Sequence, residues 1–283
     1  MTRLLVDPFR ELYMQRALIE VLVLGAVAGA VSVYVLLRRL AFVSDALTHT
    51  IFPGIALAFV LDQSLFLGAL AAALLSALLL TAVTRIPGID HDAALGVLVG
   101  AFFSVGVIIV STQRSYTGDL TALLFGRVLT VNRQEIIETL IVGAVVVAVL
   151  VAVHKELVLR AFDTVAAQGL GYRVGALDLL LNTVVALVVV AGVRAVGTVL
   201  IIALVVVPAA VARLVTDRIP AMLALAVLVS VLCGYIGLAA SYEASIHHGV
   251  RLGSGAMIVV ALTLAFTLTA VATSLARRRV RVA

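Results

Sequence analysis

Residues 42–59 read FVSDALTHTIFPGIALAF. The run is apolar and long enough to enter a membrane, yet Asp45 and His49 stand four residues apart near its start. On an α-helix this spacing places the carboxylate and the imidazole on one face. A charged side chain near a bilayer centre costs on the order of 2.5–3.5 kcal/mol, so it normally faces a partner or a water-filled path. The stretch therefore indicates a membrane helix that carries a functional face.

The composition of the whole chain also indicates a membrane protein. Of 283 residues, 64% are hydrophobic and 12% are charged, and the mean hydropathy is +1.25. No soluble core of this length needs that much apolar surface, so the chain is a polytopic membrane protein. The formal net charge of +5 comes mostly from basic residues between apolar runs and in the tail 277–283. This distribution is typical of cytoplasmic loops beside membrane lipid and does not indicate binding of nucleic acid.

Apolar windows of spanning length recur along the chain. A bilayer core of about 30 Å takes roughly 20 helical residues. Each window is predicted to be helical, because hydrocarbon does not tolerate unpaired backbone groups. The nine windows are 17–37, 41–61, 64–84, 93–111, 136–153, 177–193, 196–215, 221–240 and 255–275. We therefore predict an all-α protein with one transmembrane domain over residues 1–283, of which 1–16 form an amphipathic lead-in that is not a signal peptide.

The basic residues between the windows indicate the orientation of the chain. The polar segment 154–176 and the basic tail 277–283 are both predicted to be cytoplasmic, and four windows separate them, as the same side requires. The five earlier windows place the N-terminus outside, together with the arginines of segment 112–135, against the positive-inside rule. We therefore expect window 41–61 to be broken or re-entrant, with eight or nine crossings in total.

Asp45 and His49 are the first candidates for chemistry. A carboxylate oxygen with an imidazole nitrogen suits Mn²⁺, Zn²⁺ or Fe²⁺. The alternative is structural: Ser44 or Asp45 caps a helix, and His49 forms a hydrogen bond with a neighbouring helix.

Proline and small residues predict where helices bend or approach one another. Pro53 and Gly54 follow the Asp/His pair, and a bent segment there is similar to the broken helices at transporter sites, although a packing kink gives the same pattern. Pro208 is expected to shape a helix. Two glycine pairs at helical spacing would allow close helix packing, or reflect only a glycine-rich composition. These pairs are Gly25 with Gly29, and Gly96 with Gly100.

Four segments in one order and spacing resemble the ABC-3 family of permeases from bacterial manganese, zinc and iron importers. They are YMQRAL (13–18), LLRRLAFVSDALTHTIFPGIALAF (36–59), LTALLFGRVLTV (120–131) and VGTVLIIALVVVPAAVARL (196–214). The similarity runs from about residue 10 to residue 270. It implies a membrane subunit in the bacterial cytoplasmic membrane that forms a homodimer and sits on two copies of a cytoplasmic ABC ATPase. It also implies that a divalent metal arrives from an extracytoplasmic solute-binding protein.

The resemblance assigns roles to particular residues. Asp45 and His49 match the Asp and His of the family's path-lining motif, although this chain has Ser44 where the family typically has Gly. Segment 154–176 matches the family's coupling region, a short helix that docks on the ATPase. Its apolar anchor would be Phe162, Leu170 and Tyr172, with Arg160 and Arg173 as a charged rim. An amphipathic helix on the membrane surface is the alternative.

The segment SYEASIHHGVRLGSG (241–255) is predicted to be an outer loop, longer than is usual in the family. It adds Glu243, His247 and His248, which could form an outer metal-receiving site because imidazoles favour Zn²⁺. The alternative is a hydrophilic loop whose histidines contact water or the binding protein. His91 and Asp92 are a similar pair, but Asp92 is expected only to favour the start of a helix.

The predicted function is the permease subunit of an ATP-driven importer of Mn²⁺ or Zn²⁺, less favourably Fe²⁺. No phosphate-binding G-x-x-x-x-G-K-[ST] loop occurs in the chain, so ATP hydrolysis is assigned to a partner ATPase rather than to this subunit. No permanently bound cofactor is expected, and the metal is the transported substrate. Two alternatives are an ion-coupled secondary transporter with Asp45 as proton carrier, and an ABC permease for a metal chelate.

Overall fold

The computed structural model describes residues 9, 11–86, 88, 91–111, 128–247 and 252–282, with the helix ends at 91, 247 and 277–282 described by their backbone. Within these ranges the chain is helical and contains no strand. The helices are α2 (Leu12–Leu37), α3 (Ala41–Thr50), α4 (Phe52–Val60), α5 (Leu65–Val83), α6 (His91–Ser111), the 3-10 turn η3 (Val128–Thr130), α8 (Arg133–Ala152), α9 (His154–Phe162), α10 (Thr164–Gly169), α11 (Val174–Val196), α12 (Thr198–Val215), α13 (Ile219–His247) and α14 (Ser254–Val282). The predicted all-α fold is confirmed.

Nine helical segments in the described part of the chain are long and apolar enough to cross a membrane, with α3 and α4 together forming one of them. All nine predicted windows are found, although several helices extend beyond them. Helix α2 already begins at Leu12, so the end of the predicted lead-in belongs to the first span. Residues 1–8 and 10 of that lead-in lie outside the described residues.

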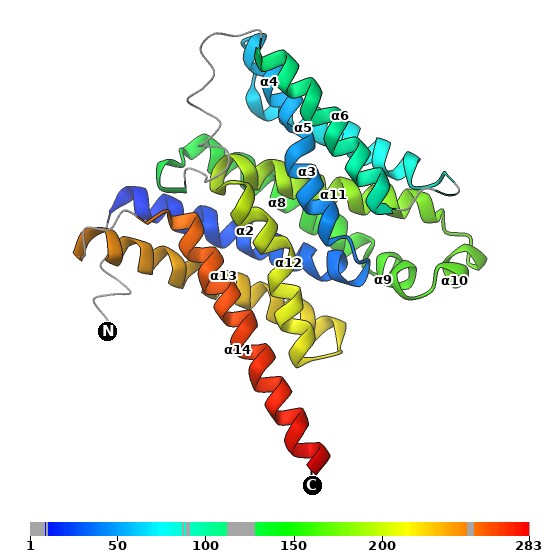
Figure 1. Cartoon of the computed structure of the whole chain (residues 1–283), viewed down its shortest axis with the longest axis vertical. Coiled ribbons are helices and arrows are strands. Elements are labelled where there is room, and N and C mark those ends of the chain that lie inside the picture. Colours follow the sequence, from blue (N-terminus) through cyan, green and yellow to red (C-terminus); the bar gives the residue numbers. More distant parts are fainter. Residues whose placement is uncertain are drawn as a thin grey trace.

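The second span is broken at Ile51, as predicted. Helix α3 ends at Thr50, and α4 begins at Phe52 with Pro53 in its first turn. Proline lacks the N–H needed to continue the helical ladder, which accounts for the break. Ile51 keeps right-handed helical angles (φ −75°, ψ −17°), so the chain bends there and α4 continues away from α3 (Figure 1). Counted together, α3 and α4 are long and apolar enough to cross a membrane, and the number of candidate crossings in the described chain is nine.

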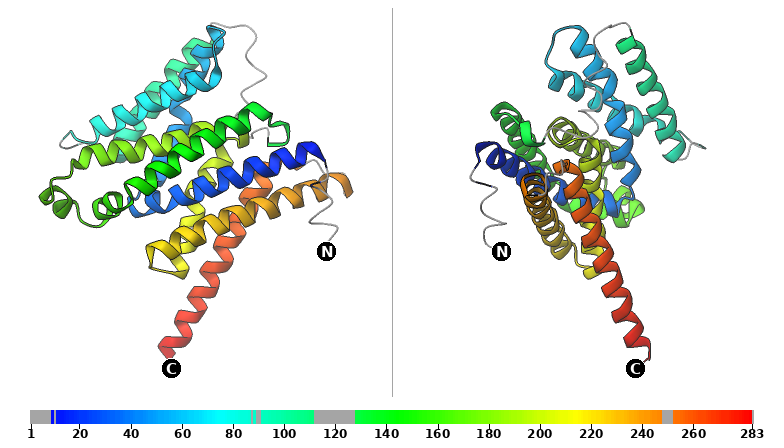
Figure 2. Two further views of the ribbon diagram at one scale, coloured as in Figure 1. Left: turned by 180° about the vertical axis from the view of Figure 1, so that it is seen from behind. Right: turned by 60° about the vertical axis from the view of Figure 1, so that its left-hand side comes forward.

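The helices form two layers (Figure 1, Figure 2). In the first layer α13, α2, α8, α11 and α5 follow one another side by side, as the view from behind in Figure 2 shows. In the second layer α14, α12, α3 and α6 are neighbours in that order. The short helices α9 and α10 lie at the end of the bundle opposite to the first turns of α2 and α8. Layered packing of this kind buries apolar side chains between the helices of both layers.

Small residues allow α2 and α13 to pack closely. A Cβ atom on Gly29 would lie 2.6 Å from Ser230 Oγ and 2.9 Å from the carbonyl oxygen of Ala226, so α2 and α13 are in close contact. Glycine pairs of this kind let helix backbones approach in lipid. The packing role predicted for Gly25 and Gly29 is therefore confirmed, since both face α13.

The second predicted glycine pair, Gly96 and Gly100 on α6, has a different environment. No described atom lies within 4 Å of a Cβ at either position. Gly54 of α4 and Gly68 of α5 form a close contact that was not predicted from the sequence. A Cβ atom on either residue would overlap the carbonyl oxygen of the other. This contact fixes α4, and with it the bend at Ile51, against α5.

Pro208 lies inside α12 and is buried, and the helix continues through it to Val215. Proline cannot donate to the carbonyl four residues earlier, and its predicted role in shaping the helix stays a prediction.

Candidate functional site

Asp45 lies within helix α3 and does not cap it. The N-cap is Leu40, which makes no side-chain cap, and α3 begins at Ala41. Ser44 is fully buried, and Thr48 Oγ1 donates to the backbone carbonyl of Asp45 at 2.7 Å. The structural alternative, in which Ser44 or Asp45 caps the helix, is therefore wrong. The carboxylate of Asp45 is left available for another role.

The side chains of Asp45 and His49 lie together on one face of α3, as the spacing predicts. Asp45 Oδ1 is 3.9 Å from His49 Nε2, and the two side chains are 52% and 41% exposed, respectively. Phe103 of α6 meets the imidazole edge-on at a ring distance of 6.3 Å, and Phe52 stacks on Phe103 at 5.5 Å. The imidazole has no hydrogen-bond partner on a neighbouring helix among the residues that the structure describes. The aromatic rings orient His49 while leaving its nitrogens available.

One chain supplies too few donors for a complete metal site at this position. Structural zinc takes four ligands, and a transport site needs at least part of such a shell from protein atoms. No group of three or more His, Cys, Asp or Glu side chains capable of holding a metal occurs within the described ranges. The pair nevertheless lies exposed on a membrane helix, where an uncovered carboxylate is unfavourable. Its face of α3 therefore needs water or a second protein surface in the membrane.

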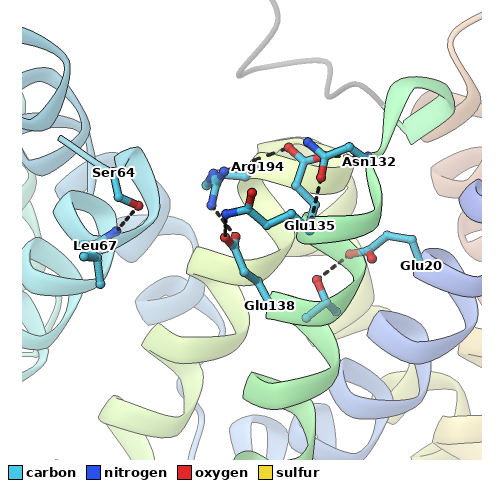
Figure 3. A network of polar contacts seen from close by, with 9 residues as sticks. Glu20, Ser64, Leu67, Asn132, Glu135, Glu138 and Arg194 are labelled. Carbon is cyan, nitrogen blue, oxygen red and sulfur yellow. Dashed lines mark hydrogen bonds and ion pairs between the residues drawn. The ribbon is translucent and has the colours of Figure 1, made fainter. Parts of the chain in front are cut away.

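A cluster of charges at the N-terminal end of α8 was not predicted from the sequence (Figure 3). We call Glu135, Glu138 and Arg194 the outer charge cluster. Arg194 of α11 donates from Nη1 to Glu138 Oε2 at 2.7 Å, and its Nη2 lies 4.0 Å from Glu135 Oε1. Asn132 and Glu135 form a reciprocal capping box at the start of α8. The cluster therefore joins α8 to α11 through opposite charges.

Two further contacts extend the outer charge cluster to other helices. The Arg194 guanidinium lies 5.6 Å from the centre of the Phe66 ring on α5, within the range of a cation–π interaction. Thr139 Oγ1 donates to Glu20 Oε1 on α2 at 2.7 Å, and Glu20 is completely buried (Figure 3). The sequence signals were a glutamate inside window 17–37 and an arginine directly after window 177–193. Neither signal identifies its partner.

Segment 154–176 folds into α9 and α10 before α11 begins. Asp163 caps α10 by accepting a hydrogen bond from the Ala166 N–H at 2.8 Å. Four large apolar side chains of this segment are exposed, and we call them the apolar patch: Phe162, Val165, Leu170 and Tyr172. Three of them were predicted as the ATPase anchor, and Val165 was missed. Arg173 is exposed beside the patch, in the position expected of a charged rim.

Arg160 differs from its prediction, because it faces the protein interior. Its Nη2 donates to Asp178 Oδ2 of α11 at 3.0 Å, and its Nη1 donates to Thr164 Oγ1 at 2.5 Å. Arg38 forms an ion pair with the other oxygen, Asp178 Oδ1, at 2.8 Å. We call Arg38, Arg160 and Asp178 the inner charge cluster. Burial lowers the pKa of Arg38, but a guanidinium remains charged at physiological pH.

The predicted outer metal-receiving site is only partly described. Helix α13 continues to His247, so Glu243 lies on a helix and not in the predicted loop, with His247 four residues further on the same helix. The side chain of His247 and the whole of His248 lie outside the described residues. At the other candidate pair, Asp92 stands in the first turn of α6, where a carboxylate favours the helix N-terminus as expected.

Known proteins share both the sequence and the fold of this chain. Residues 10–273 match the family model described as the ABC 3 transport family. The chain is 33% identical over 256 residues to the manganese transport system membrane protein MntC of Halalkalibacterium halodurans, covering 90% of this chain and 86% of MntC. It is 36% identical over 237 residues to the manganese import system permease protein ScaB of Streptococcus parasanguinis, covering 84% of each protein.

Two solved structures resemble the fold. PsaBC from Streptococcus pneumoniae in complex with Fab contains a chain that is 30% identical, with a TM-score of 0.81 and 95% of both chains covered. An inward-facing conformation of a putative metal-chelate type ABC transporter shares the fold at 15% identity, with a TM-score of 0.72 over 90% of this chain and 85% of that one. The match over almost the whole chain, together with the nine apolar helices found in its described part, shows that this is a multi-pass bacterial inner-membrane protein of the ABC 3 transport family.

Proposed function

We propose that this chain is the permease subunit that carries a divalent transition metal through an ATP-driven importer, with Mn²⁺ as the first candidate and Zn²⁺ as the second. The observation that carries the proposal is the Asp45–His49 pair, which is exposed and oriented on one face of a membrane helix. The names of the relatives favour manganese over zinc. Carboxylate and imidazole donors suit either ion, and Fe²⁺ as well.

The donor count supports a homodimer. One chain offers a single carboxylate and a single imidazole on the exposed face of α3, and a second copy related by two-fold symmetry would double this set to four donors. Cyclic dimers with self-complementary interfaces are the commonest symmetric assemblies. The same interface would cover the two exposed carboxylates and form a polar path through the membrane. We therefore place the path at the dimer axis, with Asp45 and His49 of both copies facing it.

The energy and the metal would come from two partners. A cytoplasmic ABC ATPase would dock on the apolar patch, because large exposed apolar side chains with a basic residue beside them are typical of interface anchors. ATP hydrolysis belongs to that partner, and the permease itself has no catalytic role. An extracytoplasmic binding protein would deliver the metal to the opposite end of the bundle. Glu243, His247 and His248 stay our candidates for receiving it there.

Uptake of radiolabelled Mn²⁺ and Zn²⁺ tests the proposal. The permease, its ATPase and its binding protein are expressed in a metal-starved host that lacks its own importers, and wild type is compared with His49→Ala. Asp92→Asn is the matched control, because this carboxylate is exposed in the same group of helices but only favours a helix start. We expect ATP-dependent uptake in wild type and in the control, and its loss in His49→Ala. Uptake at the wild-type rate in His49→Ala would show that the Asp45–His49 pair does not line the metal path.

The same assay separates the competing functions. Uptake that needs no ATPase and stops when the proton gradient is dissipated would identify a secondary transporter. Uptake of a metal only as its chelate would identify a chelate permease. Either result would overturn the proposed function whatever the behaviour of His49→Ala.

A further inference from the structure

The inner charge cluster joins three parts of the chain through one carboxylate. Asp178, on the second turn of α11, holds Arg160 of α9 with Oδ2 and Arg38 at the end of α2 with Oδ1. The three side chains are mostly buried, with exposed fractions of 26% for Asp178, 17% for Arg160 and 15% for Arg38. Partly buried charge pairs of this kind are held more firmly than surface pairs, because solvent screens them less. Asp178 is thus the side chain, among the described residues, that is paired with both arginines.

Arg38 stands at the base of the helix that carries the metal candidates. It is the C-cap of α2, and only Arg39 and Leu40 separate it from the first residue of α3. Arg39 has φ of +57°, so this short connection is a tight turn with little freedom. Asp45 lies four residues after the first residue of α3, about one helical turn or roughly 6 Å along its axis. A movement of Arg38 would therefore reach Asp45 through a short and stiff part of the chain.

Helix α9 is held against the bundle along one face. At its first residue, the Tyr34 hydroxyl of α2 and His154 Nδ1 are hydrogen-bonded at 2.7 Å, and Leu157 is buried one turn later. Arg160 follows on the same face with its bonds to Asp178 and Thr164. Phe162 and Val165, of the apolar patch, are exposed at the end of α9 and on α10. A force applied at the apolar patch would act directly on Arg160.

We propose that Asp178 is a positioning residue that transmits movement of α9 and α10 to the base of α3, so that the state of the ATPase sets the exposure of the Asp45 face. The inference rests on the proposed function for the identity of the partner. Its physical basis is one carboxylate whose two oxygens are each committed to a different arginine. Asparagine at this position keeps the shape but loses the charge, so the two guanidinium groups would repel each other across an uncharged amide.

The most direct test follows the accessibility of α3 and not the transported ion. Phe42→Cys places a thiol on the exposed face of α3, and Cys233, the only cysteine of the chain, is buried. In the complete complex with its ATPase and binding protein in liposomes, the rate of maleimide labelling at position 42 is measured with and without ATP. Asp178→Asn, Arg38→Gln and Asp178→Glu are compared in this background. Arg173→Gln is the control, since it removes an exposed arginine of the same segment.

We expect ATP to change the labelling rate in the Phe42→Cys background and in the Arg173→Gln control. In Asp178→Asn and Arg38→Gln the response should shrink by roughly tenfold while ATP hydrolysis stays within about twofold of the parent. Asp178→Glu, which retains the charge, should recover most of the response. A full ATP response in a folded Asp178→Asn or Arg38→Gln complex would overturn the inference. So would equal losses of hydrolysis and response, because they would indicate only a structural role.

Metal uptake by the same vesicles separates this inference from the proposed function. Absence of Mn²⁺ and Zn²⁺ uptake in wild type, with an intact ATP response at position 42, would overturn the function and leave the role of Asp178 to be judged by the labelling alone. Metal uptake by the wild type, together with an unchanged ATP response in Asp178→Asn, would support the proposed function and overturn the role of Asp178.

Discussion

Two aspartates in apolar helices of this protein have opposite surroundings. Asp178 is engaged by Arg38 and Arg160 at 2.8 and 3.0 Å, and all three side chains are largely buried. Asp45 is about half exposed, and among the described residues the ionisable group beside it is the imidazole of His49 at 3.9 Å. A buried carboxylate needs its arginines for stability, whereas an exposed carboxylate on a membrane helix gains nothing from the fold of its own chain. The difference separates a residue that holds the structure together from one kept for a ligand or a second subunit.

The charges of the outer charge cluster resemble Asp178, because they are paired and mostly buried. Arg194 pairs with Glu138 and lies near Glu135, and all three side chains are at most about one-fifth exposed. Both charged clusters therefore join helices, at opposite ends of α11, whereas the Asp45–His49 pair has no ion pair with a second helix among the described residues. Four predictions test this distinction, starting with the largest expected effect.

The same substitution at the two aspartates should give opposite results. Asp45→Asn removes a metal donor and should lower metal uptake by more than about 100-fold, because losing a ligand costs at least as much as losing a group that orients one. Its thermal unfolding midpoint in detergent should stay near the wild-type value, because the contact of this carboxylate with the half-exposed His49, at 3.9 Å, contributes little to stability. Asp178→Asn should instead destabilise the fold by about 1–3 kcal/mol. A lower midpoint in Asp45→Asn with uptake retained would reverse the comparison.

Helix α3, which carries Asp45 and His49, ends at the bend at Ile51. The geometry of this bend should depend on the contact between Gly54 and Gly68. Gly68→Ala places a Cβ atom on the carbonyl oxygen of Gly54, so α4 and α5 must separate. We expect a loss of about 1–3 kcal/mol of unfolding free energy, measured by thermal or denaturant unfolding in detergent.

Gly96→Ala on α6 is the matched control, because nothing described lies near its Cβ position. It should be neutral or stabilising by up to about 1 kcal/mol, since alanine favours helix more than glycine does. Equal destabilisation by both variants would show that the Gly54–Gly68 contact has no special role.

Removing the arginine of the outer charge cluster should affect stability more than transport. Arg194→Gln leaves Glu138 without its ion pair, for an expected loss of about 1–2 kcal/mol in the unfolding free energy. Adding Glu138→Gln should recover part of this loss, because the uncompensated carboxylate is then gone. Uptake per folded molecule is expected to remain near wild type. A selective loss of uptake would assign the cluster to the path instead.

The smallest effect is expected at a surface ion pair. Arg213 Nη1 lies 2.8 Å from Asp217 Oδ1, but the two side chains are 49% and 88% exposed. Arg213→Gln should change the unfolding free energy by less than about 0.5 kcal/mol, as is usual for exposed pairs. A change comparable to that of Arg194→Gln would show that exposure does not distinguish the pairs in this protein.

Much of the architecture could be predicted from the sequence because hydrocarbon imposes a simple rule. Each apolar window must satisfy its own backbone hydrogen bonds, so the nine windows correspond to the nine candidate helical spans of the described residues, and Pro53 marked the break in the second. The Asp45–His49 pair was also visible, because spacing within one helix fixes which side chains share a face. The ion pair of Arg160 was not predicted, because its partner Asp178 lies on another helix and spacing carries no information about it; its part in ATPase coupling stays a prediction.

The sequence by itself determined the class of the protein, the positions of its spans and the Asp45–His49 face, since all three follow from local hydropathy and helical period. Only the tertiary structure decided which charges are partnered. The ion pairs of Arg38, Arg160 and Arg194, and the contact of Gly54 with Gly68, join residues of different helices. The packing of the two layers brings these residues together, and no local pattern in the chain specifies that packing.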